Sequence, residues 1–229
     1  MGLGRGPMRF PRLITNALLL IASGAVSGQS LVNSLSNTAD VRNVFVVAHQ
    51  DDWQLFMGDV AAQAVRTTAP ATFIYLTAGD DGRDSVYWNT RERAALRSTR
   101  VVVGLATSGS DTTGCTSVPV LEHSIRKCVV GNTKSFFLRL PDGKRDGTGF
   151  ARHDYQSMRR LGTGKIKTIT AVDGSTSYRG WKDLVSTVDA LISDSAGFRS
   201  VVHTTDPSVV VNPHDHFDHR MTGRLIEEL

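Results

Sequence analysis

A continuous apolar run that stops abruptly at a polar cluster is the feature that most constrains this chain. Residues 41–48 read Val-Arg-Asn-Val-Phe-Val-Val-Ala, and His49-Gln50-Asp51-Asp52 follow directly. Apolar and β-branched residues without alternation are typical of a strand buried on both faces, which occurs mainly in parallel sheets. The run therefore predicts a central strand of a layered α/β protein, with polar groups at its carboxyl end.

The segments that follow alternate between helix and strand. The spacing of apolar residues and the turn signals between them predict helices over 55–65, 89–105 and 181–193, and strands over 72–77, 135–140 and 199–204. Residues 144–174 have weak periodicity and are predicted as loop with short elements. This order predicts an α/β fold, namely a single Rossmann-like three-layer domain with a mostly parallel sheet.

The N-terminal segment has the layout of a secretory signal peptide. Three arginines precede an apolar stretch over 13–21, and small residues fill 22–28. We expect cleavage near Ser27 or Gly28, with an uncleaved anchor as the alternative, and a single domain over 29–229. The protein would then be secreted, extracellular or in the cell envelope, with no stable membrane span after cleavage. Residues 219–229 are typical of the opening of a final helix, and we expect the C-terminus to be truncated.

Charge and cysteine content narrow the choice of partners. Without residues 1–28, the chain has 23 Lys and Arg against 22 Asp and Glu, so there is no electrostatic case for nucleic acid as a partner. Cys115 and Cys128 form one pair in a chain predicted to be exported. We expect a disulfide that closes the irregular segment between them, and two buried free thiols are the alternative.

Two polar clusters are expected at the carboxyl ends of strands. One is His49 to Asp52, and the other is His214-Asp215-His216-Phe217-Asp218-His219, after the last predicted strand. Ligands of open parallel sheets bind at this edge, so the clusters can meet. Two His and one Asp suit a catalytic zinc site, which keeps one position open for water. A helix cap and a solvated His-rich loop are the alternatives, but both clusters together favour a metal site.

The clusters also carry a resemblance to a known family. Ala48-His49-Gln50-Asp51-Asp52-Trp53 resembles the Ala-His-Pro-Asp-Asp-Glu signature of the LmbE-like or PIG-L-like zinc-dependent de-N-acetylases, and His216-Phe217-Asp218-His219-Arg220 resembles their His-Pro-Asp-His signature. Weaker similarities occur at Thr77-Ala78-Gly79-Asp80, at Arg91-Glu92-Arg93-Ala94 and at Leu138-Arg139-Leu140-Pro141-Asp142-Gly143. The matching segments occur in the family's order over roughly residues 41–224.

The resemblance implies a reaction and a role for each matching residue. The zinc ligands would be His49, Asp52 and His219. Asp51 would be the general base, and His216 would stabilise the oxyanion or protonate the leaving amine. Arg91 would hold a substrate hydroxyl or phosphate. The implied activity is removal of an acetyl group from an N-acetylated sugar or glycoconjugate, and export points to an external glycan or a cell-wall sugar.

Two positions leave alternatives open. Trp53 stands where the family has an acid, and its ring could face a sugar or pack in the core. His214 is additional, and with His216 it could supply the metal pair in place of His219. We prefer His219, because its spacing from His216 matches the family, and we expect His214 to line the pocket.

Other functions compete with deacetylation. The altered first signature is compatible with a carbohydrate-binding relative that keeps the metal for structure, although such a protein has no use for Asp51. Another metal-dependent C–N hydrolase, such as an amidase, would use the same residues. A two-metal phosphoesterase would need bridging ligands at a third strand end, where the sequence shows no further cluster. The oligomeric state is not predicted.

Overall fold

The computed structural model describes residues 41–66, 70–104, 114–193 and 199–229. The predicted signal peptide lies outside these residues, so its cleavage stays a prediction. The strands are β1 (Val41–Val47), β2 (Ala71–Thr77), β3 (Cys115–Val120), β4 (His123–Val130), β5 (Thr133–Leu140), β6 (Thr168–Thr170), β7 (Ser177–Arg179) and β8 (Arg199–His203). The helices are α2 (Asp52–Ala64), α3 (Ser85–Val102), the short 3₁₀ helix η2 (Ala151–His153), α4 (Met158–Gly162), α5 (Trp181–Ser193) and α6 (Phe217–Glu227).

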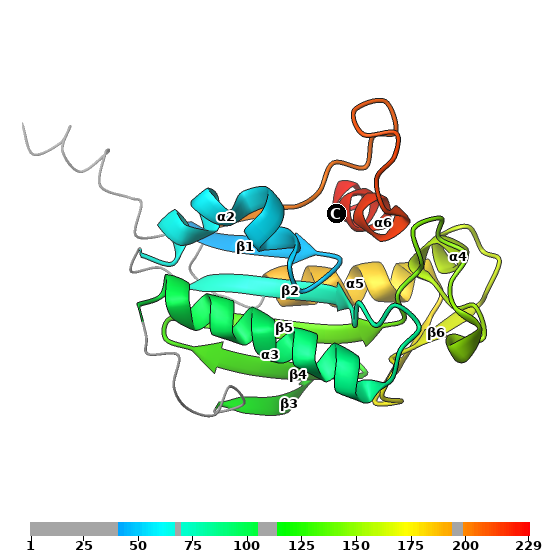
Figure 1. Ribbon diagram of the computed structural model, residues 1–229, viewed down its shortest axis with the longest axis horizontal. Coiled ribbons are helices and arrows are strands. Elements are labelled where there is room, and N and C mark those ends of the chain that lie inside the picture. The colour runs from blue at the N-terminus through cyan, green and yellow to red at the C-terminus, as the bar shows by residue number, and fades with distance from the viewer. Residues whose placement is uncertain (1–40, 67–69, 105–113, 194–198) are drawn as a thin grey trace, which may run out of the picture. The chain divides into compact units, whose positions relative to one another are not determined.

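Six strands form the central sheet in the order β3-β4-β5-β2-β1-β8. Strands β5, β2, β1 and β8 are mutually parallel, and β4 and β3 add an antiparallel edge next to β5. The carboxyl ends of β1, β2 and β5 therefore lie at one edge of the sheet (Figure 1). From β1 the chain moves to β2 and β5 on one side and returns to β8 on the other side of β1. The β1–β8 boundary is thus a topological switch point, where open α/β sheets bind ligands.

The central strands are buried on both faces, as the apolar runs predict. Phe45 and Val47 of β1 point into one core layer, and Val44 and Val46 point into the other. The first layer lies under α2 and α3, and the second lies under α4, α5 and α6 (Figure 1). These three layers confirm the Rossmann-like α/β domain. No helix among the described residues is both long and apolar enough to cross a membrane.

The helix boundaries follow local capping. The Asp84 carboxylate accepts hydrogen bonds from the backbone N–H groups of Val86 and Tyr87, at 3.1 and 3.3 Å, so α3 begins at Ser85, four residues before the predicted start. The amphipathic helix α5 has the predicted bounds and buries Leu184 with its neighbours on the same face.

The segment between the two cysteines differs from the prediction. It forms the β3–β4 hairpin rather than an irregular loop, and Cys115 lies directly opposite Cys128 in the register. The two residues form a disulfide, with their Cα atoms 4.0 Å apart. Free thiols are therefore excluded, and the bond joins the edge strand of the sheet to its neighbour.

A candidate metal centre

The two polar clusters meet at the switch point of the sheet. Ala48 and His49 follow β1, and Asp52 is the first residue of α2. His219 lies in the first turn of α6, which the chain reaches after β8. Because β1 and β8 are parallel neighbours, their carboxyl ends bring these residues together across a separation of 170 residues.

Three ligand atoms converge on one point. His49 Nδ1 lies 3.1 Å from His219 Nε2 and 3.4 Å from Asp52 Oδ1, and His219 Nε2 lies 3.2 Å from the same carboxylate oxygen. All three residues are at least nine-tenths buried, with exposed fractions of 7%, 2% and 8% for His49, Asp52 and His219. They form one of two groups among the described residues that could hold a metal ion.

The spacing of this triangle fits a tetrahedral zinc ion. Ligands about 2.0–2.1 Å from the ion lie about 3.3–3.4 Å from one another in a tetrahedron. The three observed separations, 3.1, 3.2 and 3.4 Å, are close to that value. A fourth, open position would complete the coordination, as catalytic zinc sites require. Of the open alternatives, the geometry brings together His49, Asp52 and His219, whereas His214 is not in either candidate group.

Carboxylates behind the triangle orient the ligands. Asp215 Oδ1 lies 2.7 Å from His219 Nδ1, so that nitrogen donates, and in the neutral ring Nε2 is the unprotonated nitrogen that faces the triangle. The backbone N–H of His49 donates to Asp52 Oδ2 at 2.7 Å, which leaves Oδ1 for the ligand position. Asp215 was not predicted to have a role, although its position four residues before His219, on the loop that precedes α6, was a signal for one.

The carboxylates also set the charge of the site. Burial alone would lower the pKa of His49, but the carboxylates of Asp218 and Asp52 raise it to about 10. Burial would likewise raise the pKa of Asp52, but hydrogen bonds with His219 and His49 hold it well below its usual range. The pKa of His219 is raised as well, because the Asp52 carboxylate outweighs the effect of burial. The site therefore favours a positive charge, as a cation-binding site must.

A third strand end contributes one more acid, contrary to the sequence analysis, and a second acid near it comes from α6. Asp142 follows β5 and lies 3.8 Å from His49 Nε2, and Asp218 lies 3.6 Å from the same nitrogen. With His216 they form the second candidate group. Burial and the Asp218 carboxylate raise the pKa of Asp142 to about 6. Asp80 holds this loop in place, because its carboxylate accepts the backbone N–H of Asp142 at 2.9 Å.

Asp51 and Arg91 form an ion pair at the edge of the centre. Arg91 Nη2 lies 2.5 Å from Asp51 Oδ1, and Arg91 Nη1 donates to the Gly79 carbonyl at 2.6 Å. Gly79 has a φ of +53°, and a Cβ there would lie 2.3 Å from Arg91 Nη1, so only glycine fits. Asp51 occupies the N-cap position of α2 without a side-chain capping bond, which removes the helix-cap interpretation of its carboxylate.

His216 is fixed in one tautomer by the start of α6. Its Nδ1 accepts the backbone N–H of Asp218 at 3.1 Å, so the proton of the neutral ring is on Nε2. Burial lowers the pKa of His216, and the nearby His49 and His219 lower it further against the opposing effect of Asp218. The ring lies edge-on to His49, with 4.8 Å between centroids. A neutral imidazole with an N–H donor therefore borders the triangle.

Two residues that the sequence predicts to bind substrate, Trp53 and His214, do not face the ligand triangle. Trp53 is 2% exposed, packs against Phe73 and donates its indole N–H to the Tyr75 hydroxyl at 2.9 Å. Its ring belongs to the core, so the prediction that it faces a sugar is wrong. His214 is exposed, and it lines a surface hollow with Arg145 beside the centre rather than the ligand triangle.

The comparisons with known proteins identify a family for this chain. The sequence model of one family, described as PIG-L: GlcNAc-PI de-N-acetylase, matches residues 44–229, which include every residue of the centre. Searches of curated proteins and of solved structures found no significant match.

Proposed function

The chain belongs to the PIG-L family of GlcNAc-PI de-N-acetylases, and from that premise we propose that it is an exported zinc-dependent hydrolase. Its reaction would remove the N-acetyl group from an N-acetylglucosamine-containing glycan or glycoconjugate, with release of acetate. The observation that carries the proposal is the triangle of His49, Asp52 and His219, whose ligand atoms lie 3.1–3.4 Å apart.

Zinc fits this donor set better than other common cations. Two imidazole nitrogens and one carboxylate oxygen are ordinary zinc ligands, whereas Mg²⁺ and Ca²⁺ prefer oxygen ligands only. When bound, zinc supplies Lewis-acid chemistry, polarising a carbonyl and lowering the pKa of water toward neutrality. His49, Asp52 and His219 would hold the ion, and Asp215 would keep the His219 tautomer that ligation needs.

Asp51 is the residue we propose as general base. Its side chain is 57% exposed and is not used for capping α2, so the carboxylate can reach a water molecule beside the ligand Asp52. As base, Asp51 takes the proton from the attacking water and passes it toward the leaving amine. Arg91 is then a positioning residue, because its guanidinium is engaged by Asp51 and the Gly79 carbonyl.

His216 suits stabilisation of the oxyanion rather than donation of a proton to the amine. Its lowered pKa keeps the ring neutral near pH 7, and the hydrogen bond to Nδ1 places the proton on Nε2. A neutral N–H donor stabilises negative charge that develops on the acetyl oxygen without giving up its proton. Of the two roles that the family resemblance implies for this histidine, the structure favours this one.

A two-metal phosphoesterase is the second candidate, and the group around His49 Nε2 is the observation that favours it. That group contains Asp142, His216 and Asp218. Its separations of 3.6–3.8 Å are wider than those of the triangle, and His216 Nδ1 is already hydrogen-bonded. Metal analysis separates the candidates, because the deacetylase needs one ion per chain and the phosphoesterase needs two.

A matched pair of variants tests the deacetylase. We expect the purified protein to retain zinc and to release acetate from N-acetylglucosamine oligomers. Asp51→Asn should retain zinc and lower kcat by about 10²–10⁴. Asp59→Asn is the control, because Asp59 is an exposed carboxylate of the same helix. If the wild type and both variants bind zinc but release no acetate from any oligomer, the proposed deacetylase activity is wrong.

A further inference from the structure

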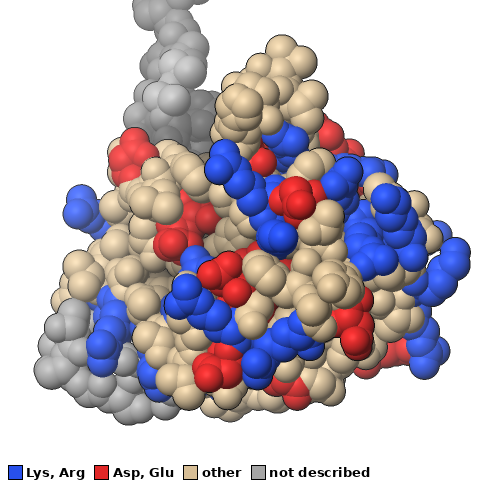
Figure 2. Space-filling view, turned by 45° about the vertical axis from the view of Figure 1, so that its right-hand side comes forward, with Lys and Arg blue, Asp and Glu red and all other residues tan. Residues whose placement is uncertain are grey.

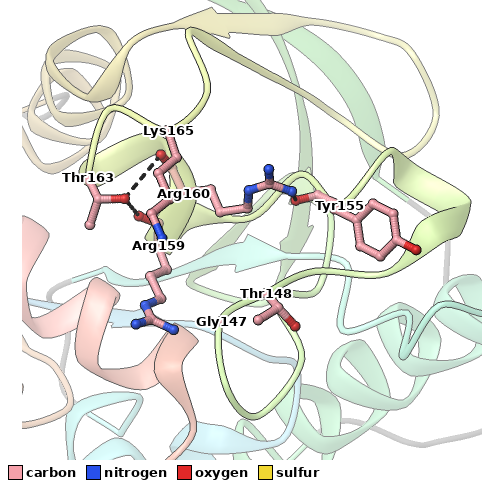
Figure 3. A pocket seen from close by; sticks show the side chains of 7 residues that line it. All are labelled: Gly147, Thr148, Tyr155, Arg159, Arg160, Thr163 and Lys165. Atoms are coloured by element: carbon pink, nitrogen blue, oxygen red, sulfur yellow. Dashed lines mark hydrogen bonds between the residues drawn. The ribbon is translucent and has the colours of Figure 1, made fainter.

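A basic cavity lies next to the loops of the metal centre. It has a volume of about 280 Å³, and its lining residues are Gly147, Thr148, Tyr155, Arg159, Arg160, Thr163 and Lys165. Figure 3 shows the Arg160 side chain extending toward Tyr155, while Arg159 points toward α6. The lining includes three cationic side chains and no carboxylate. A cavity slightly below the usual range for small-molecule sites suits one charged group rather than a large ligand.

The basic charge of the chain is concentrated in the segment that contributes the lining of this cavity. Residues 144–167 have seven Lys and Arg against two Asp, whereas the rest of the chain has 19 Lys and Arg against 20 Asp and Glu. Figure 2 shows many Lys and Arg side chains toward the right-hand side of this face, with Asp and Glu side chains interspersed among them. The net charge of the predicted mature chain is close to zero, but this segment is locally positive and attracts anions.

The two arginines keep free hydrogen-bonding capacity. Arg159 Nη1 donates to the Asp146 carbonyl at 2.6 Å, and Arg160 Nη1 donates to the Tyr155 carbonyl at 2.9 Å. Each guanidinium has five N–H donors, so these backbone bonds fix its position and leave donors for a ligand. Among the described residues, no carboxylate forms an ion pair with Arg159, Arg160 or Lys165.

Phe217 connects the cavity to the metal centre. The guanidinium carbon of Arg159 lies 4.1 Å from the centroid of the Phe217 ring, and Phe217 stands between His216 and Asp218 in the chain. Gly147 permits this approach, because its φ is +73° and a Cβ there would lie 2.4 Å from Arg159 Cδ and 3.0 Å from Phe217 Cβ. The Arg159 guanidinium is thereby held beside the segment that contains His216 and Asp218.

We propose that this cavity binds an oxyanion group, with Arg159, Arg160 and Lys165 as its cationic contacts. The planar guanidinium groups suit two oxygens of a sulfate, phosphate or carboxylate, and Lys165 adds a point charge. The group would be attached to the glycan that is deacetylated at the metal centre, and this second part rests on the proposed function. The preferred substrate is then an acidic glycoconjugate, and neutral oligomers are deacetylated less efficiently.

Binding of inorganic sulfate tests the cavity without any substrate. We expect saturable calorimetric binding at low ionic strength that weakens as sodium chloride screens the charges. Lys165→Gln should weaken it about threefold to fivefold, the range for one exposed charge, and Arg160→Gln should weaken it likewise. Lys167→Gln is the matched control, because Lys167 is exposed two residues away and does not line the cavity. Unsaturable binding, or equal affinity in all four proteins, would overturn the proposal.

Substrate comparison tests the link to the metal centre. Oligomers of N-acetylglucosamine are compared with otherwise equal oligomers that have a sulfate, a phosphate or a carboxylate. We expect kcat/KM to be higher for one of the acidic series, and this preference to fall in Lys165→Gln but not in Lys167→Gln. Equal kcat/KM for neutral and acidic oligomers in every variant refutes the subsite and leaves the deacetylase intact. Sulfate binding that depends on Lys165, with no oligomer deacetylated, refutes the proposed function and leaves the oxyanion cavity.

Discussion

Replacing Asp215 by asparagine isolates the electrostatic support of the proposed zinc ligand His219. The Asp215 Oδ1 atom accepts from His219 Nδ1 at 2.7 Å and from the backbone N–H of His216 at 2.8 Å. An asparagine carbonyl can accept both hydrogen bonds, so the substitution removes the negative charge and keeps the geometry. A neutral acceptor makes the imidazole a weaker ligand, because the negative charge behind it raises its basicity.

The expected loss follows from this geometry. The Asp215 side chain is 15% exposed, so solvent screens its charge only in part. Loss of such an outer carboxylate typically weakens metal affinity about 10–100-fold, equivalent to about 1.4–2.8 kcal/mol. We expect the loss of zinc affinity in Asp215→Asn to be near the lower end of this range, because the hydrogen bond to His219 is kept.

Competition with a chromophoric chelator measures the zinc affinity directly. Asp206→Asn is the matched control, since Asp206 lies on the same loop and its carboxylate accepts only the backbone N–H of Ser208 in the described contacts. Equal zinc affinity of Asp215→Asn and wild type, with unchanged circular dichroism, would show that His219 is not a ligand held by Asp215.

The remaining predictions concern protons, the core and the disulfide. Because the pKa of His49 is raised to about 10, the free protein holds that proton at pH 7, so metal binding should release about one proton and strengthen as pH rises toward 10. Calorimetry in buffers of different ionisation enthalpy checks this, and equal heats in all buffers contradict it. Trp53→Ala should lower the free energy of unfolding in urea by about 3–5 kcal/mol, since its indole is buried and hydrogen-bonded to Tyr75. An altered KM with unchanged stability would contradict this and indicate that Trp53 contacts the substrate. Replacing Cys115 and Cys128 by serine should cost about 3 kcal/mol, measured in the same way, and an unchanged midpoint would contradict it.

Secondary structure was predictable where burial is uniform along a segment. Strands β1 and β2 are continuous apolar runs because helices cover both faces of the sheet, and α5 has a single apolar face with clear helical spacing. The β3–β4 hairpin was missed because an edge strand needs no apolar run. Its residues 115–120 are half-exposed Cys-Thr-Ser-Val-Pro-Val, and partners across the hairpin rather than local composition define it.

The proposed metal ligands were predictable because they lie in two short segments at strand ends. Their surroundings were not, since Asp142 comes from a third strand end, and its proximity to His49 depends on the β2–β5 pairing. Trp53 illustrates the opposite problem. A tryptophan beside a polar cluster is equally compatible with a sugar platform and with the core, and only packing against Phe73 decides between them.

The long sequence separation within the ligand triangle has a consequence for folding. His49 and His219 are 170 residues apart, so a shared ion would act as a cross-link that closes most of the described chain into one loop. The disulfide spans only 13 residues and restrains one hairpin at the edge of the sheet. Removal of the ion by a chelator should therefore lower the unfolding temperature of the domain more than reduction of the disulfide does. Metal occupancy would then report whether β1 and α6 have come together, which makes it a measure of completed folding as well as of catalytic competence.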